Sequence, residues 1–382
     1  MKVLPLTGNL AAAEAMRQIN PDVVAIYPIT PQSEIAEKFA EFVANGEVTT
    51  ELICVESEHS AMSACVGASA AGARAMTATA SQGLALMWEI LSVASGLRLP
   101  IVMPVSNRAL SAPINIHCDH SDSMGARDLG WIQIYSENPQ EVYHNVIFAL
   151  RLAELVNLPA MVMQDGFVTS HCVENVAVLE DEQVREFIGE RKAPYNFFDF
   201  ENPVTLGPFA LPNYFFEIKR QQFEGMREAS EQFKVVAKEF EELIGKPYEK
   251  VEAFEVEDAD FVIVTMSSSA GTAKQVARRL REKGEKVGVL KIRLFRPFPY
   301  NEVAKLLAGK KLAVLDRSLS LGAMPPLFTD VKLAVKSNCE VQSYVFGLGG
   351  RDLLEEHVEK VFRDLKEKPI EEERIRFLGV RE

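Results

Sequence analysis

The chain has 382 residues and a formal net charge of −13, and 47% of its residues are hydrophobic while 25% are charged. This balance is that of an ordinary folded protein with room for two domains. The negative charge and the lack of a basic, aromatic-rich patch argue against a nucleic-acid surface, because phosphate binding needs clustered cations. No apolar stretch is long enough to cross a bilayer and the N-terminus lacks a signal-peptide core, so we expect a cytoplasmic protein with no membrane partner.

The cysteines are scattered along the chain without any CxxC pair. They are Cys54, Cys65, Cys118, Cys172 and Cys339. Disulfide frameworks, zinc ribbons and iron–sulfur sites depend on recognisable cysteine spacings, and none is present. We therefore expect any redox cluster to be held by another polypeptide.

In the first half of the chain, short apolar runs alternate with helical patterns. The predicted strands span residues 23–27, 52–55, 75–80, 100–105, 131–135 and 159–163. Strands separated by helices of this length predict a doubly wound parallel sheet covered on both faces. In such sheets, ligands bind at the carboxyl ends of the strands.

Unusual polar residues follow several of these predicted strands. Thr30 follows the first strand, where Thr30 and Pro31 are predicted to be the N-cap and first residue of a helix. Glu58 follows the second strand and Arg108 the fourth. Because the strand ends share one edge, we expect these side chains to lie near one another.

The second half begins with a segment of different character. Residues 195–216 are rich in proline, phenylalanine and asparagine without a usable period, and we assign them to an extended arm at a subunit interface. Residues 218–244 form a charged helical pattern that ends at Gly245. A smaller α/β domain with parallel strands is predicted from about residue 251. Its strands span residues 260–266, 287–292, 311–316 and 340–346.

Glu58 is the leading candidate for chemistry. It follows a predicted buried strand and begins a helix whose small side chains let another backbone come close. The bland interpretation is a first-turn acid that is stabilised by the helix dipole. The functional interpretation is a carboxyl that acts on an apposed aromatic heterocycle such as the aminopyrimidine of thiamine diphosphate, whose ring nitrogen takes a proton from a glutamate. Glu56 is the rival.

Arg108 begins a long polar loop after a buried strand. An arginine in this position commonly forms a surface salt bridge, but its planar fork also suits a substrate carboxylate. Thr30 would add a hydroxyl and the positive end of a helix to the same anion. The loop also contains His117, Asp119, His120 and Asp122, whose spacing fits no trusted metal motif. We interpret them as a hydrogen-bonded loop that shapes a site.

A glycine-rich segment near the C-terminus resembles a nucleotide-binding fingerprint only in part. Residues 347–351 read GLGGR, and Asp352 stands where the third glycine of GxGxxG would be, so the pattern fails.

Four separated motifs resemble the alpha subunit of the pyruvate:ferredoxin oxidoreductase (pyruvate synthase) family, among the 2-oxoacid:ferredoxin oxidoreductases. They are YPITPQSE (27–34), ESEHSAMSACVGASAAGARA (56–75), SNRALSAPINIHCDHSDSM (106–124) and QDGFVTSH (164–171). LKIRLFRPFP (290–299) and AVLDRS (313–318) resemble the C-terminal domain of that subunit.

The resemblance implies a pyrimidine-binding domain with a C-terminal arm and helix over residues 1–235, a linker over 236–254 and a transketolase C-terminal-like domain over 255–382. It implies that Glu58 activates the aminopyrimidine of thiamine diphosphate, and that Thr30 and Arg108 bind the 2-oxoacid carboxylate. The segment after the fourth strand resembles enzymes that act on pyruvate, with 2-oxobutyrate as an alternative substrate.

The resemblance also implies partner chains. The beta subunit would hold the diphosphate, Mg²⁺ and the nearest [4Fe-4S] cluster, while delta and gamma chains, ferredoxin and CoA complete the reaction. The sequence agrees, since the GDG triplet of diphosphate sites is absent. A scaffold without catalytic residues and a self-sufficient transketolase-like enzyme are the alternatives.

Overall fold

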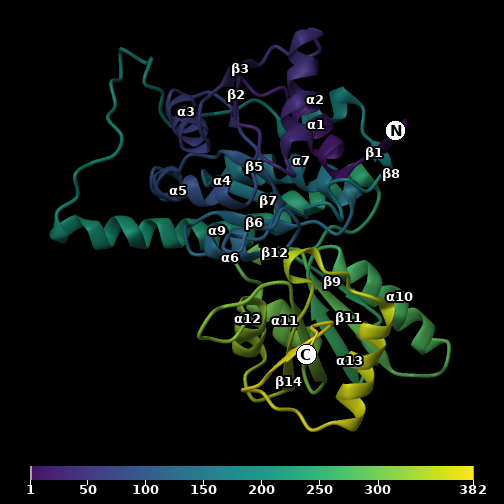
Figure 1. Cartoon of the computed structure of the whole chain (residues 1–382). Helices are drawn as coiled ribbons and strands as arrows, with labels where there is room; N and C mark the ends of the chain where they lie inside the picture. The colour runs from purple at the N-terminus through teal and green to yellow at the C-terminus, as the bar shows by residue number, and fades with distance from the viewer. Residues whose placement is uncertain (1, 382) are drawn as a thin grey trace.

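The structure is a computed structural model that describes residues 2–381. It consists of two α/β parts, one above the other in Figure 1, with the N-terminal part in purple to teal and the C-terminal part in green to yellow. None of the helices within residues 2–381 combines the length and apolarity that crossing a membrane requires.

The N-terminal part contains most of the helices. Its elements are β1 (Lys2–Leu6), α1 (Gly8–Ile19), β2 (Val23–Ile26), α2 (Ser33–Ala44), β3 (Glu51–Cys54), α3 (Glu58–Ala70), β4 (Ala75–Met76), α4 (Ser81–Leu86), α5 (Trp88–Gly96), β5 (Val102–Asn107), α6 (Ser121–Gly125), β6 (Ile132–Tyr135), α7 (Pro139–Val156), β7 (Ala160–Asp165), β8 (Glu174–Val178), α8 (Asp181–Ile188) and α9 (Pro212–Ile244).

The C-terminal part begins after α9. Its elements are β9 (Val251–Phe254), β10 (Phe261–Thr265), α10 (Ser269–Arg281), β11 (Val287–Ile292), β12 (Leu294–Arg296), α11 (Tyr300–Leu307), β13 (Lys311–Asp316), α12 (Pro326–Val335), β14 (Glu340–Val345), the 3₁₀ turn η1 (Leu348–Gly350), α13 (Glu355–Glu367) and β15 (Ile375–Phe377).

The N-terminal sheet has the order β12-β6-β7-β5-β4-β2-β3. Its neighbouring strands are parallel except for β12, which pairs with β6 in the antiparallel sense. This confirms the predicted doubly wound parallel sheet. The second sheet, β15-β14-β13-β10-β11-β9, is also parallel except for β9.

Two predicted strands of the N-terminal sheet differ from expectation. The strand before Glu58 was expected to be buried, but β3 lies at the sheet edge and its Glu51 and Cys54 are exposed. The third predicted strand pairs regularly only over β4, with one isolated bridge between Thr79 and Val105 further along. The chain leaves the sheet early there and turns into α4.

The two parts share one hydrophobic cluster and a buried charge network. Tyr135 of β6 packs edge-on against Phe295 of β12, with ring centroids 5.9 Å apart. The Lys291 Nζ atom lies 2.7 Å from carboxylate oxygens of both Glu137 and Glu141. The two parts are joined by these ion pairs and by β12, a three-residue strand of the C-terminal segment that pairs with β6 of the N-terminal sheet.

The predicted arm is irregular and exposed as far as residue 211, and its last residues belong to α9, which begins earlier than expected at Pro212. Figure 1 shows the arm leaving the body of the protein and returning to the far end of α9. Its side chains include Phe200, which is 84% exposed, and Phe209, which is 91% exposed. The described residues therefore leave most of the apolar surface of these two aromatic side chains uncovered.

Candidate functional site

Glu58 is the first residue of α3, and its side chain lies against the start of α4. Ser57 caps the helix by accepting a hydrogen bond from the Ser60 N–H, so the backbone end is satisfied without Glu58. Within residues 2–381 the Glu58 carboxylate has no hydrogen-bond partner, although the residue is only 7% exposed. Its rival Glu56 is exposed and accepts a hydrogen bond from Ser60, which lowers its pKa.

The Glu58 carboxylate packs closely against Thr79 and Gly83. A Cβ atom on Gly83 would lie 2.7 Å from Glu58 Oε1 and 2.5 Å from Thr79 Oγ1, so only glycine fits there. The Thr79 hydroxyl is buried and has no partner among the described residues. An unpaired carboxylate and an unpaired hydroxyl fit the hydrogen-bonding needs of the aminopyrimidine of thiamine diphosphate, which has both ring and amino nitrogens to pair.

The structure brings Thr30 and Arg108 together. Arg108 is buried, and its Nη1 donates to the Thr30 carbonyl at 2.9 Å while its Nε donates to the Asn115 carbonyl at 3.0 Å. A guanidinium has five N–H bonds, so the others remain for a ligand. Nη2 has no partner in the part of the chain that the structure describes. This arrangement holds the guanidinium in place and leaves Nη2 without a hydrogen bond to the described residues.

The expected helix start at Thr30 is wrong. Residues 30–32 form a turn, and α2 begins at Ser33 with Gln32 as its N-cap. The reason is tertiary: the Asn9 side chain donates a hydrogen bond to the Pro31 carbonyl at 2.8 Å and holds the turn against α1. Thr30 is therefore exposed before the helix, so it offers a hydroxyl without the helix start.

Asp122 connects residues at the ends of neighbouring strands through hydrogen bonds. Its position in the loop did not by itself predict this role. One carboxylate oxygen accepts from the backbone N–H groups of Ser81 and Arg108, and the other accepts from the Asn107 amide and the Ser123 N–H. Burial raises the pKa of Asp122 to about 6, despite the opposing effect of these bonds. The predicted hydrogen-bonded loop is thus centred on a carboxyl that ties α4 to Arg108.

We expect Asp122→Asn to destabilise the assembled protein more at about pH 5 than at about pH 8. The folded-state pKa of about 6 lies above the ordinary value of 3.8, so Asp122 adds most to the free energy of unfolding at low pH. That contribution is lost as the pH rises through about 6, and asparagine has no such titration. Thermal unfolding at both pH values measures the gap in Tm, and an equal gap would contradict the prediction.

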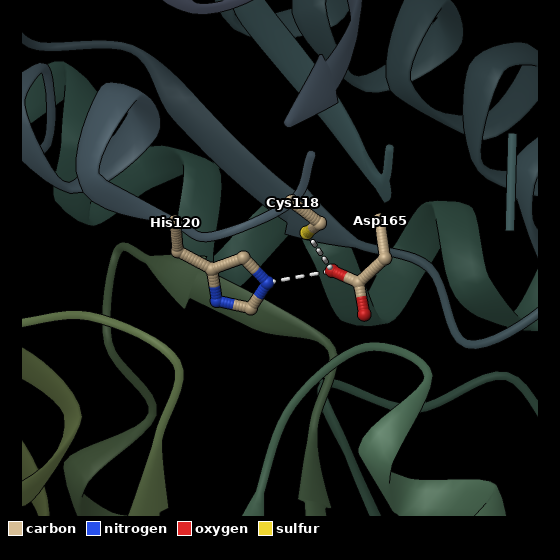
Figure 2. A group of neighbouring side chains, drawn as sticks. All are labelled: Cys118, His120 and Asp165. Atoms are coloured by element: carbon tan, nitrogen blue, oxygen red, sulfur yellow. Dashed lines mark hydrogen bonds and ion pairs between the residues drawn. The ribbon is translucent and has the colours of Figure 1, made fainter. Parts of the chain in front are cut away.

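A buried cluster joins the same loop to the C-terminal part. Figure 2 shows its members from the N-terminal part. His120 Nε2 lies 2.7 Å from Asp165 Oδ1 at the end of β7, and the Cys118 thiol lies 3.5 Å from the same oxygen. The Arg317 guanidinium, from the end of β13, lies 2.8 Å from Asp165 Oδ2, which also accepts from Ser268. Although burial opposes ionisation, Arg317 holds the pKa of Asp165 below its usual range.

This cluster is better suited to joining the two parts than to holding a metal ion. Donor atoms of Cys118, His120 and Asp165 all lie within 4.8 Å of one another. Burial, however, raises the pKa of the Cys118 thiol, so it stays protonated, and Arg317 already supplies the positive charge beside Asp165. A divalent ion would meet a guanidinium and a neutral thiol here.

Sequence reasoning gave no role to Thr79, Gly83, Asp165 or Arg317. Asp165 is the last residue of the apolar strand β7, and Arg317 directly follows the apolar strand β13. Their positions at the ends of predicted strands were a signal by which they could have been identified. Thr79 and Gly83 have ordinary residue types, and only the packing of α3 against α4 reveals them.

Comparisons with known proteins identify the family of this chain. The family described as "Pyruvate flavodoxin/ferredoxin oxidoreductase, thiamine diP-bdg" matches residues 14–239, and "Pyruvate:ferredoxin oxidoreductase core domain II" matches residues 259–358. "Pyruvate synthase subunit PorA" of Thermotoga maritima is 55% identical over 383 residues, which is 99% of this chain and 98% of the relative.

Two further relatives extend the comparison. "Ketoisovalerate oxidoreductase subunit VorA" of Pyrococcus abyssi is 47% identical over 366 residues, covering 94% of this chain and 93% of the relative. A solved 2-oxoglutarate:ferredoxin oxidoreductase from Magnetococcus marinus shares the fold, with a TM-score of 0.74 and 21% identity. That match covers 95% of this chain and 65% of the solved chain. The chain therefore belongs to the pyruvate flavodoxin/ferredoxin oxidoreductase family, as its motifs predicted.

Proposed function

We propose that this chain is the alpha subunit of a cytoplasmic, thiamine-diphosphate and iron–sulfur dependent pyruvate:ferredoxin oxidoreductase. Pyruvate, CoA and two oxidised ferredoxins would give acetyl-CoA, carbon dioxide, a proton and two reduced ferredoxins, and the reaction would be reversible. The observation that carries the proposal is the Glu58 carboxylate, which lies without a protein partner beside the bare Cα of Gly83. The 55% identity with a pyruvate synthase subunit over nearly the whole chain supports it.

Three residues of this chain would serve the reaction. Glu58 would hold a proton at the aminopyrimidine ring nitrogen of the cofactor, while the Arg108 guanidinium and the Thr30 hydroxyl would hold the carboxylate of the 2-oxoacid. Bound thiamine diphosphate supplies the carbon nucleophile and the electron sink for decarboxylation. The chain contributes orientation and control of one proton, and the buried position of Glu58 and Arg108 excludes bulk water from both contacts.

The rest of the cofactor set would belong to partner chains. The lack of a GDG triplet and of paired cysteines in the sequence supports a beta subunit that holds the diphosphate, Mg²⁺ and the nearest [4Fe-4S] cluster. Gamma and delta subunits would complete the electron path to ferredoxin. Thiamine diphosphate would thus lie at a subunit boundary, with its pyrimidine ring facing Glu58.

The arm over residues 195–216 is proposed to contact another subunit of this enzyme. Its exposed phenylalanines supply apolar area that the chain does not cover itself. We expect limited proteolysis to cut the arm in the isolated chain and to spare it in the assembled complex. The irregular, exposed turn at residues 283–286, between α10 and β11, serves as an internal reference for protease activity. Equal cleavage of the arm in both states would contradict the assignment.

Purification of the native complex, followed by ferredoxin reduction with a panel of 2-oxoacids and CoA, tests the proposed function. We expect pyruvate to give the highest kcat/KM, and 2-oxobutyrate to follow. The relative from Pyrococcus abyssi makes 2-ketoisovalerate the alternative to pyruvate as the preferred substrate. If none of the 2-oxoacids supports ferredoxin reduction, the proposal is overturned. If the complex prefers 2-ketoisovalerate, that compound takes the place of pyruvate as the proposed substrate.

A further inference from the structure

The loop that begins with Arg108 is anchored to the C-terminal part of the chain. The Asn115 side-chain Nδ2 donates to the Gly349 carbonyl at 3.0 Å. The Gly350 N–H in turn donates to the Cys118 carbonyl at 2.7 Å. Residues 347–350, which we name the glycine turn, therefore form backbone-mediated contacts with a loop more than two hundred positions earlier in the chain.

The far end of the loop is anchored to the same part. The His120 N–H donates to the Arg317 carbonyl at 2.8 Å, and the side chains of both residues meet at Asp165. Both ends of the segment 115–120 are thus fixed to the C-terminal part. Residues 111–114, 116 and 117 of the loop are exposed, whereas residues 118–120 are buried.

Asn115 links the glycine turn directly to the guanidinium. Its carbonyl accepts the Arg108 Nε–H at 3.0 Å, its Nδ2 binds Gly349, and its Oδ1 accepts the His117 N–H at 2.6 Å. The side chain is thus held at both of its polar atoms, which restricts the position of the carbonyl. The direction of the Arg108 fork therefore depends on where the glycine turn places Asn115.

The glycines of the turn are required by space and by backbone conformation. Gly347, Gly349 and Gly350 all have positive φ, at 65°, 62° and 83°. A Cβ on Gly349 would collide with Asn115 Nδ2, and a Cβ on Gly350 would collide with His117 Cβ. The glycine-rich segment that fails as a nucleotide fingerprint thus has a different use, which is close packing against the Arg108 loop.

We propose that the glycine turn of the C-terminal part positions the Arg108 guanidinium for the 2-oxoacid carboxylate, with Asn115 as the positioning residue between them. This inference rests on the proposed role of Arg108. It makes the affinity for the 2-oxoacid depend on the C-terminal part. Neither Gly349 nor Asn115 needs to contact the substrate.

The test uses Gly349→Ala in the assembled enzyme, with Gly309→Ala as the matched control. Gly309 lies in the same part and has a positive φ of 76°, but nothing lies within 4 Å of its added Cβ. We expect Gly349→Ala to raise the KM for pyruvate and the inhibition constant of oxamate, an unreactive carboxylate analogue, by about fivefold to tenfold. The kcat should stay within about twofold, and Gly309→Ala should change neither constant.

Asn115→Asp is the second variant, in case Gly349→Ala fails to assemble. It keeps the acceptor for His117 but loses the donor to Gly349, and we expect the same rise in both constants. In an Arg108→Ala background, neither variant should raise the constants further, because the two residues act through one contact.

The outcomes separate the two claims. If Arg108→Ala leaves the pyruvate KM and the oxamate constant unchanged, the proposed role of Arg108 fails. If Arg108→Ala raises both constants while Gly349→Ala and Asn115→Asp behave like Gly309→Ala, the positioning role alone is overturned.

Discussion

Replacement of Glu58 by glutamine is expected to lower the kcat for pyruvate-dependent ferredoxin reduction by at least about a hundredfold, the lower range for loss of a positioned acid or base. Glutamine has the same shape but cannot give a proton to a ring nitrogen. Because the wild-type carboxylate has no protein partner within residues 2–381, the variant loses no internal hydrogen bond. The complex should therefore still assemble with the wild-type subunit ratio.

Glu56→Gln is the matched control for this experiment. Glu56 lies two positions earlier, is exposed, and accepts a hydrogen bond from Ser60 at the start of the same helix. We expect nearly wild-type turnover from it. Subunit ratio, thiamine diphosphate content and turnover should be measured together on both variants. Full turnover by Glu58→Gln would show that this chain is a scaffold for chemistry carried out elsewhere.

Arg108→Ala is expected to raise the pyruvate KM by at least about tenfold, which is the scale of losing a charged hydrogen-bonded contact. The buried guanidinium has N–H bonds left over after it binds the Thr30 and Asn115 carbonyls, and alanine has none. Arg108→Lys should fall between the two, because it keeps the charge but loses the fork. Steady-state kinetics with pyruvate as the varied substrate provide the measurement.

Arg127→Ala is a suitable control for Arg108→Ala. Arg127 lies shortly after the sequence motif that contains Arg108, but it is partly exposed and its ion pair with Asp128 spans 3.7 Å. An exposed pair of this length contributes little, so we expect unchanged kinetics. If Arg108→Ala leaves the saturation curve unchanged, Arg108 has no place in the substrate site.

Much of this fold could be predicted because parallel α/β sheets follow local rules. Apolar runs such as β5 and β7 are buried along their whole length, and the residues after them gather at one edge. That rule predicted that Thr30 and Arg108 lie near each other, and the Arg108 guanidinium does donate a hydrogen bond to the Thr30 carbonyl. The roles of Thr30, Glu58 and Arg108, and the domain boundaries at 235 and 255, stay predictions.

What the sequence did not predict depends on contacts between distant segments. The turn at Thr30 is held by Asn9 from α1, and β12 is a strand only because β6 of the other part accepts it. Likewise, nothing near Asp122 in the sequence says that it accepts backbone hydrogen bonds from Ser81, forty-one positions earlier. Local propensity carries no information on such contacts.

The central claim is that an acid of this chain serves a cofactor held by a neighbouring subunit. A structure of the co-purified complex with thiamine diphosphate bound tests it most directly. We predict that the Glu58 carboxyl lies about 3 Å from the aminopyrimidine ring nitrogen, while another chain holds the diphosphate. A Glu58 side chain turned away from the ring, with a different acid at that nitrogen, would contradict the account.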